Sequence, residues 1–265
     1  MTRIEFCGLP GSGKSALQEP FIAELRRVTG RPVMDREAMV DCCLRRRDDG
    51  LIKNTLKRFP GFMWKRFLGL EYDLPELHLF VSANPSLMAQ IFQSLAHPET
   101  SAQARQCIIY AFFRTILEHC LAVSHLKDEI LVADEGFIHR AFTIFGYLRS
   151  EVREDELRVF ADSIPLSDAL IHIEASPEIC EQRLALRAAY PLLLSDLTRE
   201  ARIEQLRTGC ERLRIAVNQV ERRGVRVFRI ENNGTLESGI QQIHRFAIEM
   251  IDAWKHSGAS AATLA

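Results

Sequence analysis

The chain has 265 residues, of which 47% are hydrophobic and 26% are charged, an ordinary balance for a globular protein. Its formal net charge is −1, so the protein has no overall field that would attract nucleic acid or an anionic membrane. These values exclude partners that are bound through bulk charge. A charged ligand has to be bound by a local cluster of side chains.

The seven cysteines are odd in number and show no C-x-x-C spacing, which favours free thiols in a reducing compartment. No signal peptide is readable, and no uninterrupted apolar run reaches the about 18 residues of a membrane span. We therefore expect a cytoplasmic protein that does not cross a membrane.

Five short apolar runs are predicted to be strands, and long helical stretches separate them. This alternation predicts a parallel α/β sheet with crossover helices, in one domain over residues 1–265. The tail 257–265 is small and polar, so we expect it to be disordered. The predicted strands are Arg3–Cys7, Pro32–Met34, Ile130–Ala133, Ala169–Ile173 and Val225–Ile230.

The first strand runs into the sequence GLPGSGKS, which fits G-x-x-x-x-G-K-[ST] between a strand and a helix. Glycines let the backbone curl until successive N–H groups face one concavity, and the helix N-terminus adds partial positive charge. Lys14 would reach the β- and γ-phosphates of ATP, and the Ser15 hydroxyl would bind Mg²⁺. The predicted phosphate-binding residues are Gly8, Gly11, Ser12, Gly13, Lys14 and Ser15.

Pro20 lies six residues after Lys14, inside the helix that should follow this loop. Proline in a helix interior removes one hydrogen bond and clashes with the preceding turn. The sequence therefore predicts a kink or an early end of the helix near residues 18–20.

Asp35 follows the second strand, and two roles are open for it. At a strand end that faces the same cleft, its carboxylate could hold or deprotonate a substrate hydroxyl. It could equally cap a helix predicted over Arg36–Leu44, because Asp is a favoured N-cap residue.

The stretch from about residue 50 to 126 has few strand signals and is predicted to be a helical insertion over or beside the ligand cleft. Residues 53–66 carry five basic side chains and no acidic one. This run could face a ligand, or it could be an ordinary solvated helix face. The inserted helices could also pair two copies of the chain as a homodimer.

The third strand ends in Asp134, followed by Glu135. Ligands of open α/β sheets lie beyond the carboxyl ends of the strands, where both side chains would project. We predict Asp134 as the metal-side carboxylate and Glu135 as the group that accepts a proton from the attacking hydroxyl or from water. The alternative is that both acids only stabilise the start of the next helix.

Arg183 and Arg187 are four residues apart on one predicted helix, which begins with Ser176 as N-cap and Pro177 at its first position. A proline-containing break and a new helix after Thr198 follow. A helix, a break and a second helix with arginines at the hinge are typical of a closing lid, here about residues 183–200. The alternative is a solvated arginine face.

The last strand ends in Asn-Asn-Gly, in which Asn233 and Gly234 favour a tight turn without a required function. At the end of a sheet, the same turn also suits a loop that touches a purine ring.

In their order along the chain, these motifs resemble the small P-loop kinases: nucleoside monophosphate, deoxynucleoside and shikimate-type kinases. The resemblance covers 2–31, 127–139 and 166–238, and it implies a three-layer P-loop NTPase fold around five parallel strands, with an inserted acceptor-binding region. The arginine that follows the strand-end acids in that family is absent here, where the sequence reads Asp-Glu-Gly. Arg140 or Arg114 could replace it.

The resemblance implies an ATP- and Mg²⁺-dependent phosphotransferase that acts on a small hydroxyl- or phosphate-bearing acceptor. In such an enzyme Lys14, Arg183 and Arg187 would neutralise charge on the transferring group, while Glu135 or Asp35 takes the acceptor proton. Asn233 and Gly234 would lie beside adenine. The alternatives are a nucleotide-gated NTPase switch that acts on a protein partner, and a sulfotransferase-like enzyme.

Overall fold

The computed structural model describes residues 1–46, 74–98, 100–146, 152–187, 190–191 and 194–256. One five-stranded sheet, in the order β2-β3-β1-β4-β5, forms its centre, and all four neighbouring pairs are parallel. The predicted α/β fold is therefore confirmed, and each predicted strand agrees with the structure to within two residues. The strands are β1 (Thr2–Gly8), β2 (Val33–Met34), β3 (Ile130–Ala133), β4 (Ala169–Glu174) and β5 (Arg226–Glu231).

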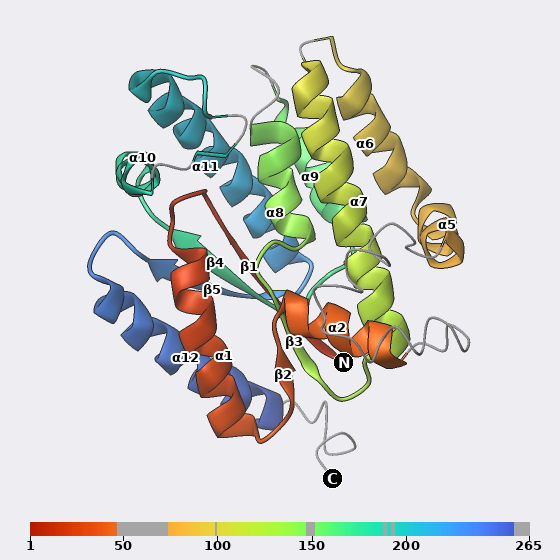
Figure 1. Cartoon of the computed structure of the whole chain (residues 1–265), viewed down its shortest axis with the longest axis vertical. Coiled ribbons are helices and arrows are strands. Elements are labelled where there is room, and N and C mark those ends of the chain that lie inside the picture. The colour runs from red at the N-terminus through yellow and green to blue at the C-terminus, as the bar shows by residue number, and fades with distance from the viewer. Residues whose placement is uncertain (47–73, 99, 147–151, 188–189, 192–193, 257–265) are drawn as a thin grey trace.

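Helices cover both faces of the sheet and make it the middle of three layers (Figure 1). One face packs on α1 (Lys14–Thr29) and α12 (Leu236–His256), which also pack on each other. The other helices lie on the opposite face or at the β2 edge. They are α2 (Arg36–Arg46), α5 (Leu74–Ala83), α6 (Pro85–Ala96), α7 (Ala102–His125), α8 (Phe137–Ala141), the π-helix η1 (Phe142–Gly146), α9 (Glu154–Ser163), α10 (Pro177–Leu186) and α11 (Arg199–Arg222).

The central strand β1 is buried on both faces, as parallel sheets between helical layers require. Ile4 and Phe6 point to the α1/α12 side and join a core cluster that includes Phe21. Cys7 points to the opposite side and joins the larger cluster formed with the helices from α5 to α11. The alternation of side chains along one strand thus links the two cores.

α1 runs without interruption from Lys14 to Thr29, although Pro20 lies inside it. The expected early end of this helix is therefore wrong. Leu17, Phe21 and Leu25 are all fully buried on its inner face. Burial of such side chains is worth about 1.5–3 kcal/mol each, which together exceeds the roughly 3 kcal/mol that an internal proline costs.

The described part of the insertion consists of α5, α6 and α7, as predicted for a helical segment. By length and composition alone, α7 could cross a membrane, which the sequence analysis did not expect. Ile108, Phe112 and Ile116 of this helix are fully buried in the larger core cluster, so core packing accounts for one face of it. The basic run 53–66 and the tail 257–265 lie outside the described residues, and the homodimer stays a prediction.

Parallel pairing brings the carboxyl ends of the strands to one edge of the sheet. Gly8 at the end of β1 is in register with Ile173 of β4, and Glu5 with Ala133 of β3. The glycine loop, the acids after β3 and the start of α10 therefore meet at this edge, where a ligand of an open α/β sheet is expected.

We expect Phe21→Ala to lower the free energy of unfolding by about 3–5 kcal/mol, because it leaves a cavity between α1 and the sheet. The Phe21 ring is fully buried and makes an edge contact with Phe6 at 5.4 Å between ring centroids. Urea unfolding followed by circular dichroism measures the loss. Phe92→Ala is the matched control, since that ring is 55% exposed on α6. Equal losses for both variants would contradict the packing described for α1.

Candidate active site

Two glycines of the loop between β1 and α1 lie in tight backbone contact with other elements. Gly11 has φ +81°, and a Cβ there would lie 2.4 Å from the carbonyl oxygen of Cys180 in α10. Gly13 has φ +98°, and its Cβ would lie 2.3 Å from Nδ2 of Asn232. Both the left-handed conformation and the missing space require glycine. The loop is therefore held between α10 and the end of β5.

The end of β5 supports this loop through hydrogen bonds. Asn232, which is 4% exposed, donates from Nδ2 to the carbonyl oxygen of Ser12 at 2.7 Å. Arg183 donates to the same oxygen at 3.3 Å and to the Gly234 carbonyl at 3.4 Å. Asn233 accepts from the Ser176 N–H at 2.8 Å. The structure thus brings Arg183 to the loop, while Asn233 contacts Ser176 and Gly234 contacts Arg183.

Asn232 was not among the predicted site residues, although it supports the loop directly. Its signal in the sequence was its place as the first polar residue after a strand that ends at the ligand edge. The sequence analysis assigned the turn to the two residues after it. Only the tertiary contact shows that the buried amide belongs to Asn232.

The ammonium group of Lys14 is bound by the loop itself. Its Nζ donates to the carbonyl oxygens of Gly8 at 2.9 Å and Leu9 at 3.1 Å. Burial lowers the pKa of Lys14, while the negative charge of Glu135 opposes this shift. The Lys14 amine is therefore a hydrogen-bond donor held at the loop, bound to carbonyl acceptors that a phosphate oxygen could replace.

A Mg²⁺ ion fits the residues that the sequence predicted for it. Oδ1 of Asp134 is buried and has no hydrogen-bond partner, and Ser15 is exposed in the first turn of α1. Gln18, one turn further, donates to the Val132 carbonyl at 3.1 Å and ties α1 to the end of β3. No group of three or more His, Cys, Asp or Glu side chains in the described ranges could hold a metal. The remaining ligands would be phosphate oxygens and water, as is usual for Mg²⁺.

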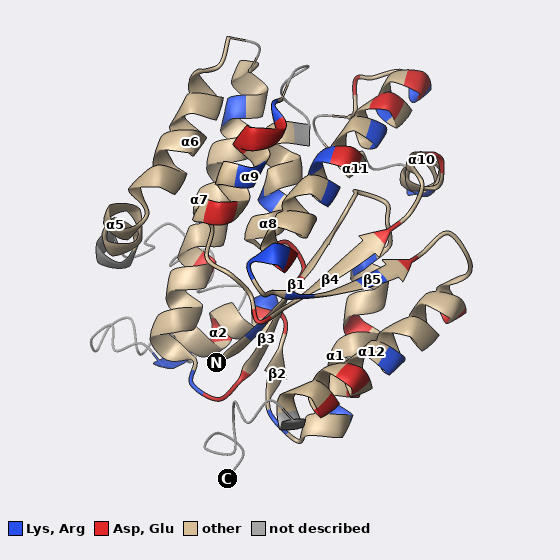
Figure 2. Ribbon diagram, turned by 180° about the vertical axis from the view of Figure 1, so that it is seen from behind, with Lys and Arg blue, Asp and Glu red and all other residues tan. Residues whose placement is uncertain are grey.

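Glu135 is surrounded by positively charged or nitrogen-bearing side chains. Its carboxylate lies 3.2 Å from Arg140 Nη2, 3.7 Å from Arg114 Nη2 and 3.6 Å from His139 Nε2. Charged residues of both signs meet here, where the strand ends approach α8 (Figure 2). Burial raises the pKa of Glu135, but His139, Arg140, Lys14 and Arg114 outweigh it and hold that pKa at about 2.

His139 itself contributes little charge at neutral pH. Burial, together with the charge of Lys14, lowers the pKa of His139 to about 3, so the ring is neutral there. The attraction that keeps Glu135 ionised therefore comes from the two arginines and Lys14. Arg140 is 3% exposed and is fixed by a hydrogen bond from Nε to the Thr115 hydroxyl at 2.8 Å.

The Glu5 carboxylate fills the space beside Gly136, the residue after Glu135. A Cβ on Gly136 would lie 2.0 Å from the carboxyl carbon of Glu5, which is 2% exposed. Glu5 also accepts from the Ile138 N–H at 3.4 Å, at the start of α8. An arginine here would have to displace the Glu5 carboxylate. Arg140, one turn later, and Arg114 contact Glu135 instead.

Asp35 acts as the N-cap of α2 in the structure. Its Oδ1 accepts from the Ala38 N–H at 2.7 Å, which is one of the two roles that the sequence left open. The next residue, Arg36, lies 3.5 Å from Glu118 of α7, and Arg114 lies 3.6 Å from the same carboxylate. A chain of alternating charges therefore runs from α2 through α7 to Glu135.

A small cavity adjoins this chain of charges. Its volume is about 30 Å³, and Arg36, Glu118 and Glu135 are among the side chains that line it. Such a space holds about one water molecule. A substrate that reaches Glu135 would therefore bind on the open side of this carboxylate rather than inside the cavity.

The predicted lid is partly described. α10 begins with the Ser176 N-cap and α11 with the Thr198 N-cap, as predicted. Arg187 is the C-cap of α10 and is exposed. Of the two predicted arginines, Arg183 is the one that hydrogen-bonds to the loop. Residues 188–189 and 192–193 of the break lie outside the described ranges.

A charged contact that the sequence analysis missed joins the two helices of the lid. Glu181 of α10 is 2% exposed, and its carboxylate lies 3.0 Å from Arg202 and 3.3 Å from Arg199 of α11. Tyr190 donates to the same carboxylate at 3.4 Å and lies under the Arg202 guanidinium, 4.1 Å from ring centroid to carbon. These contacts fix the angle between α10 and α11.

No protein-family model and no curated protein matches the chain. Among solved structures, the chain is similar to deoxyadenosine kinase from M. mycoides, solved with the products dCMP and dCDP. The match covers 95% of this chain and 100% of that one, at 13% sequence identity and a TM-score of 0.46. At these values the likeness carries no argument about the reaction, which has to be inferred from the site.

We expect Gly13→Ala to weaken Mg·ATP binding by about tenfold or more, because the strain and the clash with Asn232 together cost at least about 1–3 kcal/mol. Isothermal titration calorimetry measures the change. Gly30→Ala is the matched control: Gly30 also has positive φ, at +65°, but a Cβ there meets nothing within 4 Å. If both variants bind Mg·ATP as the wild type does, the loop is not the nucleotide site.

Buried His139 predicts a loss of stability in acid. Its folded pKa, about 3, lies below the unfolded value of 6.5, so between these values the unfolded chain binds one more proton. The contribution of neutral His139 to the free energy of unfolding is therefore fully present above about pH 6.5. Below that pH the free energy of unfolding falls by up to about 1.4 kcal/mol per pH unit. Urea unfolding from pH 7 to 4 should show a shallower loss for His139→Gln than for the wild type. The exposed His78→Gln is the control, and an unchanged slope for His139→Gln would refute the assignment.

Proposed function

We propose that the protein is an ATP-dependent phosphotransferase that moves the γ-phosphate to a small-molecule hydroxyl or phosphate acceptor. One observation carries the proposal: a buried ammonium group, an unpartnered carboxylate oxygen and an ionised glutamate lie together at the carboxyl edge of the sheet. These belong to Lys14, Asp134 and Glu135. The free cysteines fit a cytoplasmic enzyme.

The glycine loop supplies the phosphate-binding part of the proposed mechanism. Its backbone N–H groups and the N-terminus of α1 attract the phosphate oxygens. Lys14 would release the Gly8 and Leu9 carbonyls and donate to phosphate oxygens instead, where it would neutralise the phosphate charge. Mg²⁺ bound by Ser15 and Asp134 would supply further charge neutralisation to the phosphates. Arg183 fixes the Ser12 carbonyl, and it lies close enough to the loop to contact nucleotide as well.

We assign to Glu135 the orientation of the acceptor. A carboxylate with a pKa near 2 is a weak base at neutral pH, but it is always ionised and accepts a hydrogen bond well. Phosphoryl transfer through a loose transition state needs little proton removal before the new bond forms, so positioning matters more than basicity. Arg114 and Arg140 would keep the carboxylate aimed at the acceptor. Asp35 remains the other candidate for the group that takes the proton of the acceptor hydroxyl.

The charges around Glu135 favour a polar acceptor. Arg36 and Arg114 alternate with Glu118 and Glu135 along α2, α7 and the end of β3. Such a surface pairs with hydroxyl and phosphate groups through charge-assisted hydrogen bonds. A nucleoside, a nucleotide or a sugar-like molecule carries these groups. The inserted helices would then bind the acceptor, while the loop binds ATP.

An acceptor screen tests the proposal. Wild type and Lys14→Ala are incubated with Mg·ATP and nucleosides, nucleotides, sugars or aminoglycosides, and the release of ADP is compared with acceptor-free hydrolysis. We expect at least one acceptor to raise the wild-type rate and to be recovered as its phosphorylated product, with no rise for Lys14→Ala. If no small molecule raises the rate and a protein partner stimulates hydrolysis instead, the nucleotide-gated switch replaces the kinase.

We expect Glu135→Gln to lower turnover by about 100-fold while changing the affinity for ATP by only a few-fold. The substitution removes the charge that orients the acceptor and leaves the loop intact. Turnover with the best acceptor and calorimetric titration of Mg·ATP measure the two effects. Glu249→Gln on α12, an exposed glutamate that pairs with Arg245, is the control. A loss of ATP affinity that matches the loss of turnover would show that Glu135 serves the nucleotide and not the acceptor.

A further inference from the structure

The guanidinium of Arg140 in α8 is buried, with the residue only 3% exposed, so the protein itself has to satisfy its N–H groups. Nη2 donates to the carboxylate Oε2 and to the backbone carbonyl oxygen of Glu135, both at 3.2 Å. Nε donates to the hydroxyl oxygen of Thr115 in α7 at 2.8 Å. One guanidinium therefore joins the side chain and the main chain of Glu135 to a single hydroxyl of the inserted helices.

The Thr115 hydroxyl accepts from Arg140 because its own hydrogen is already engaged. That hydrogen is donated to the carbonyl oxygen of Ala111, one turn earlier in α7, at 3.0 Å. A threonine hydroxyl has one hydrogen and two lone pairs, whereas an arginine nitrogen only donates. The direction of both hydrogen bonds is therefore fixed. Thr115 is 5% exposed, so the bond to Arg140 is protected from bulk water.

The two carboxylate oxygens of Glu135 have different surroundings. Oε2 lies 3.2 Å from Nη2 of Arg140 and 3.7 Å from Nη2 of Arg114, so both arginines act on the same oxygen. Oε1 lies 3.6 Å from Nε2 of His139, a ring that burial keeps neutral at neutral pH by lowering its pKa. Oε1 therefore keeps more of its capacity to accept a hydrogen bond from an acceptor hydroxyl than Oε2 does.

A second carboxylate, that of Glu118 in α7, also attracts the Arg140 guanidinium. Burial lowers the pKa of Arg140, and the negative charges of Glu135 and Glu118 oppose this shift. The guanidinium is planar and rigid, so an acceptor at Nε determines where Nη2 points. With Thr115 at Nε, Nη2 meets Glu135. Without that hydroxyl, the buried Nε–H would turn toward another oxygen, because a buried donor without an acceptor is unfavourable, and the contact with Oε2 would loosen.

We propose that Thr115 is a positioning residue of the candidate active site, which acts through Arg140 to hold Oε2 of Glu135 and to leave Oε1 for the acceptor. The inference rests on the proposed function, since it is the acceptor hydroxyl that Oε1 would receive. Thr115 itself touches neither acceptor nor nucleotide in this proposal. Because it belongs to α7, the inserted helices would set the direction of the Glu135 carboxylate as well as bind the acceptor.

A double-mutant cycle on stability tests the path from Thr115 to Glu135 without requiring a reaction. Thr115→Val removes the hydroxyl and keeps the branched shape, and Glu135→Gln removes the charge that Arg140 binds. If Arg140 connects the two residues, the loss of unfolding free energy in the double variant should be smaller than the sum of the two single losses. Urea unfolding measures all four proteins.

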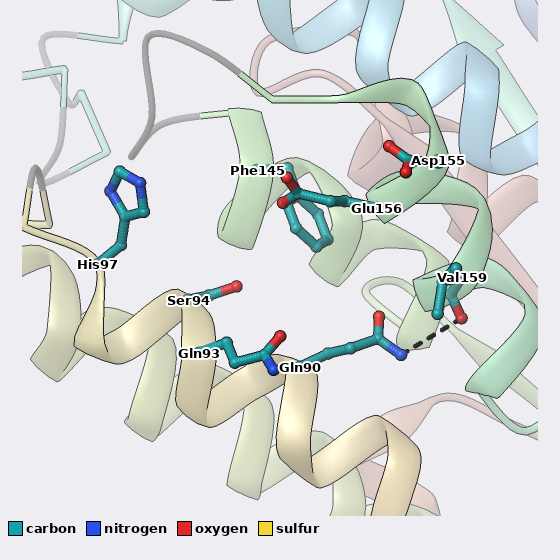
Figure 3. A pocket seen from close by; sticks show the side chains of 8 residues that line it. All are labelled: Gln90, Gln93, Ser94, His97, Phe145, Asp155, Glu156 and Val159. Atoms are coloured by element: carbon teal, nitrogen blue, oxygen red, sulfur yellow. Dashed lines mark hydrogen bonds between the residues drawn. The ribbon is translucent and has the colours of Figure 1, made fainter.

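Thr100→Val is the matched control, because it also removes a buried threonine hydroxyl. Thr100 is 3% exposed, and its hydroxyl donates to the carbonyl oxygen of Ser94 at 3.0 Å. Ser94 lies on α6 in the wall of a separate pocket of about 350 Å³ between α6, η1 and α9, whose described lining contains neither Glu135 nor Arg140 (Figure 3). The stability losses of Thr100→Val and Glu135→Gln should therefore add.

Turnover with the best acceptor of the screen tests the positioning itself. We expect Thr115→Val to lower kcat by about tenfold and to change the calorimetric affinity for Mg·ATP by less than about twofold. Thr115→Ser keeps the hydroxyl and should turn over within a few-fold of the wild type, as should Thr100→Val. Circular dichroism shows whether Thr115→Val folds, and Thr115→Ala, which also lacks the hydroxyl, replaces it in both experiments if it does not.

Three results would overturn the proposal: additive stability losses for Thr115→Val and Glu135→Gln, wild-type kcat in Thr115→Val, or equal losses of kcat in Thr115→Val and Thr115→Ser. A failure of the proposed function gives a different result. If the wild type transfers phosphate to no small molecule while the Thr115 and Glu135 losses are coupled, the kinase reaction is wrong and the path from Thr115 to Glu135 is confirmed.

Discussion

The described structure depends on how closely the glycine loop approaches its two supports. Without a Cβ at residues 11 and 13, the loop backbone reaches the Cys180 carbonyl on one side and the Asn232 amide on the other. This contact fixes the loop relative to β4, α10 and β5 at once. The loop in turn positions the side chains that we assign to the phosphates. Lys14 and Ser15 follow it directly in α1, and Arg183 hydrogen-bonds to the Ser12 carbonyl.

A second constraint acts on the acceptor side. Glu5 occupies the volume next to Gly136, so a side chain at that position would displace the buried Glu5 carboxylate. The positive charge that Glu135 needs is supplied from α7 and from the end of α8, through Arg114 and Arg140. The positive charge around Glu135 is thus supplied by residues that are distant from it in sequence or one helical turn away.

Local patterns in the sequence predicted the sheet, and they placed the glycine loop, Asp134 and Glu135 at the strand ends where the structure has them, because strand alternation, glycine spacing and strand-end position are properties of short segments. These local patterns failed where contacts between segments that are distant in the sequence determine the structure. Pro20 was expected to kink or end the helix near residues 18–20, but α1 continues past it to Thr29, with Phe21 and its neighbours buried. Glu5 and Glu181 carry no local signal, and the strand-end position of Asn232 does not reveal its contact with the loop, so their roles follow only from the residues that the fold places against them.

The central claim is that the loop binds the phosphate chain itself. Competition of unlabelled ligands against a fluorescent ATP analogue tests it most directly, with Mg·ATP, Mg·tripolyphosphate and adenosine as competitors. The account predicts that tripolyphosphate displaces the analogue although it has no base, that adenosine alone does not, and that Lys14→Ala weakens displacement by both phosphate compounds. Displacement by adenosine but not by tripolyphosphate would contradict the account.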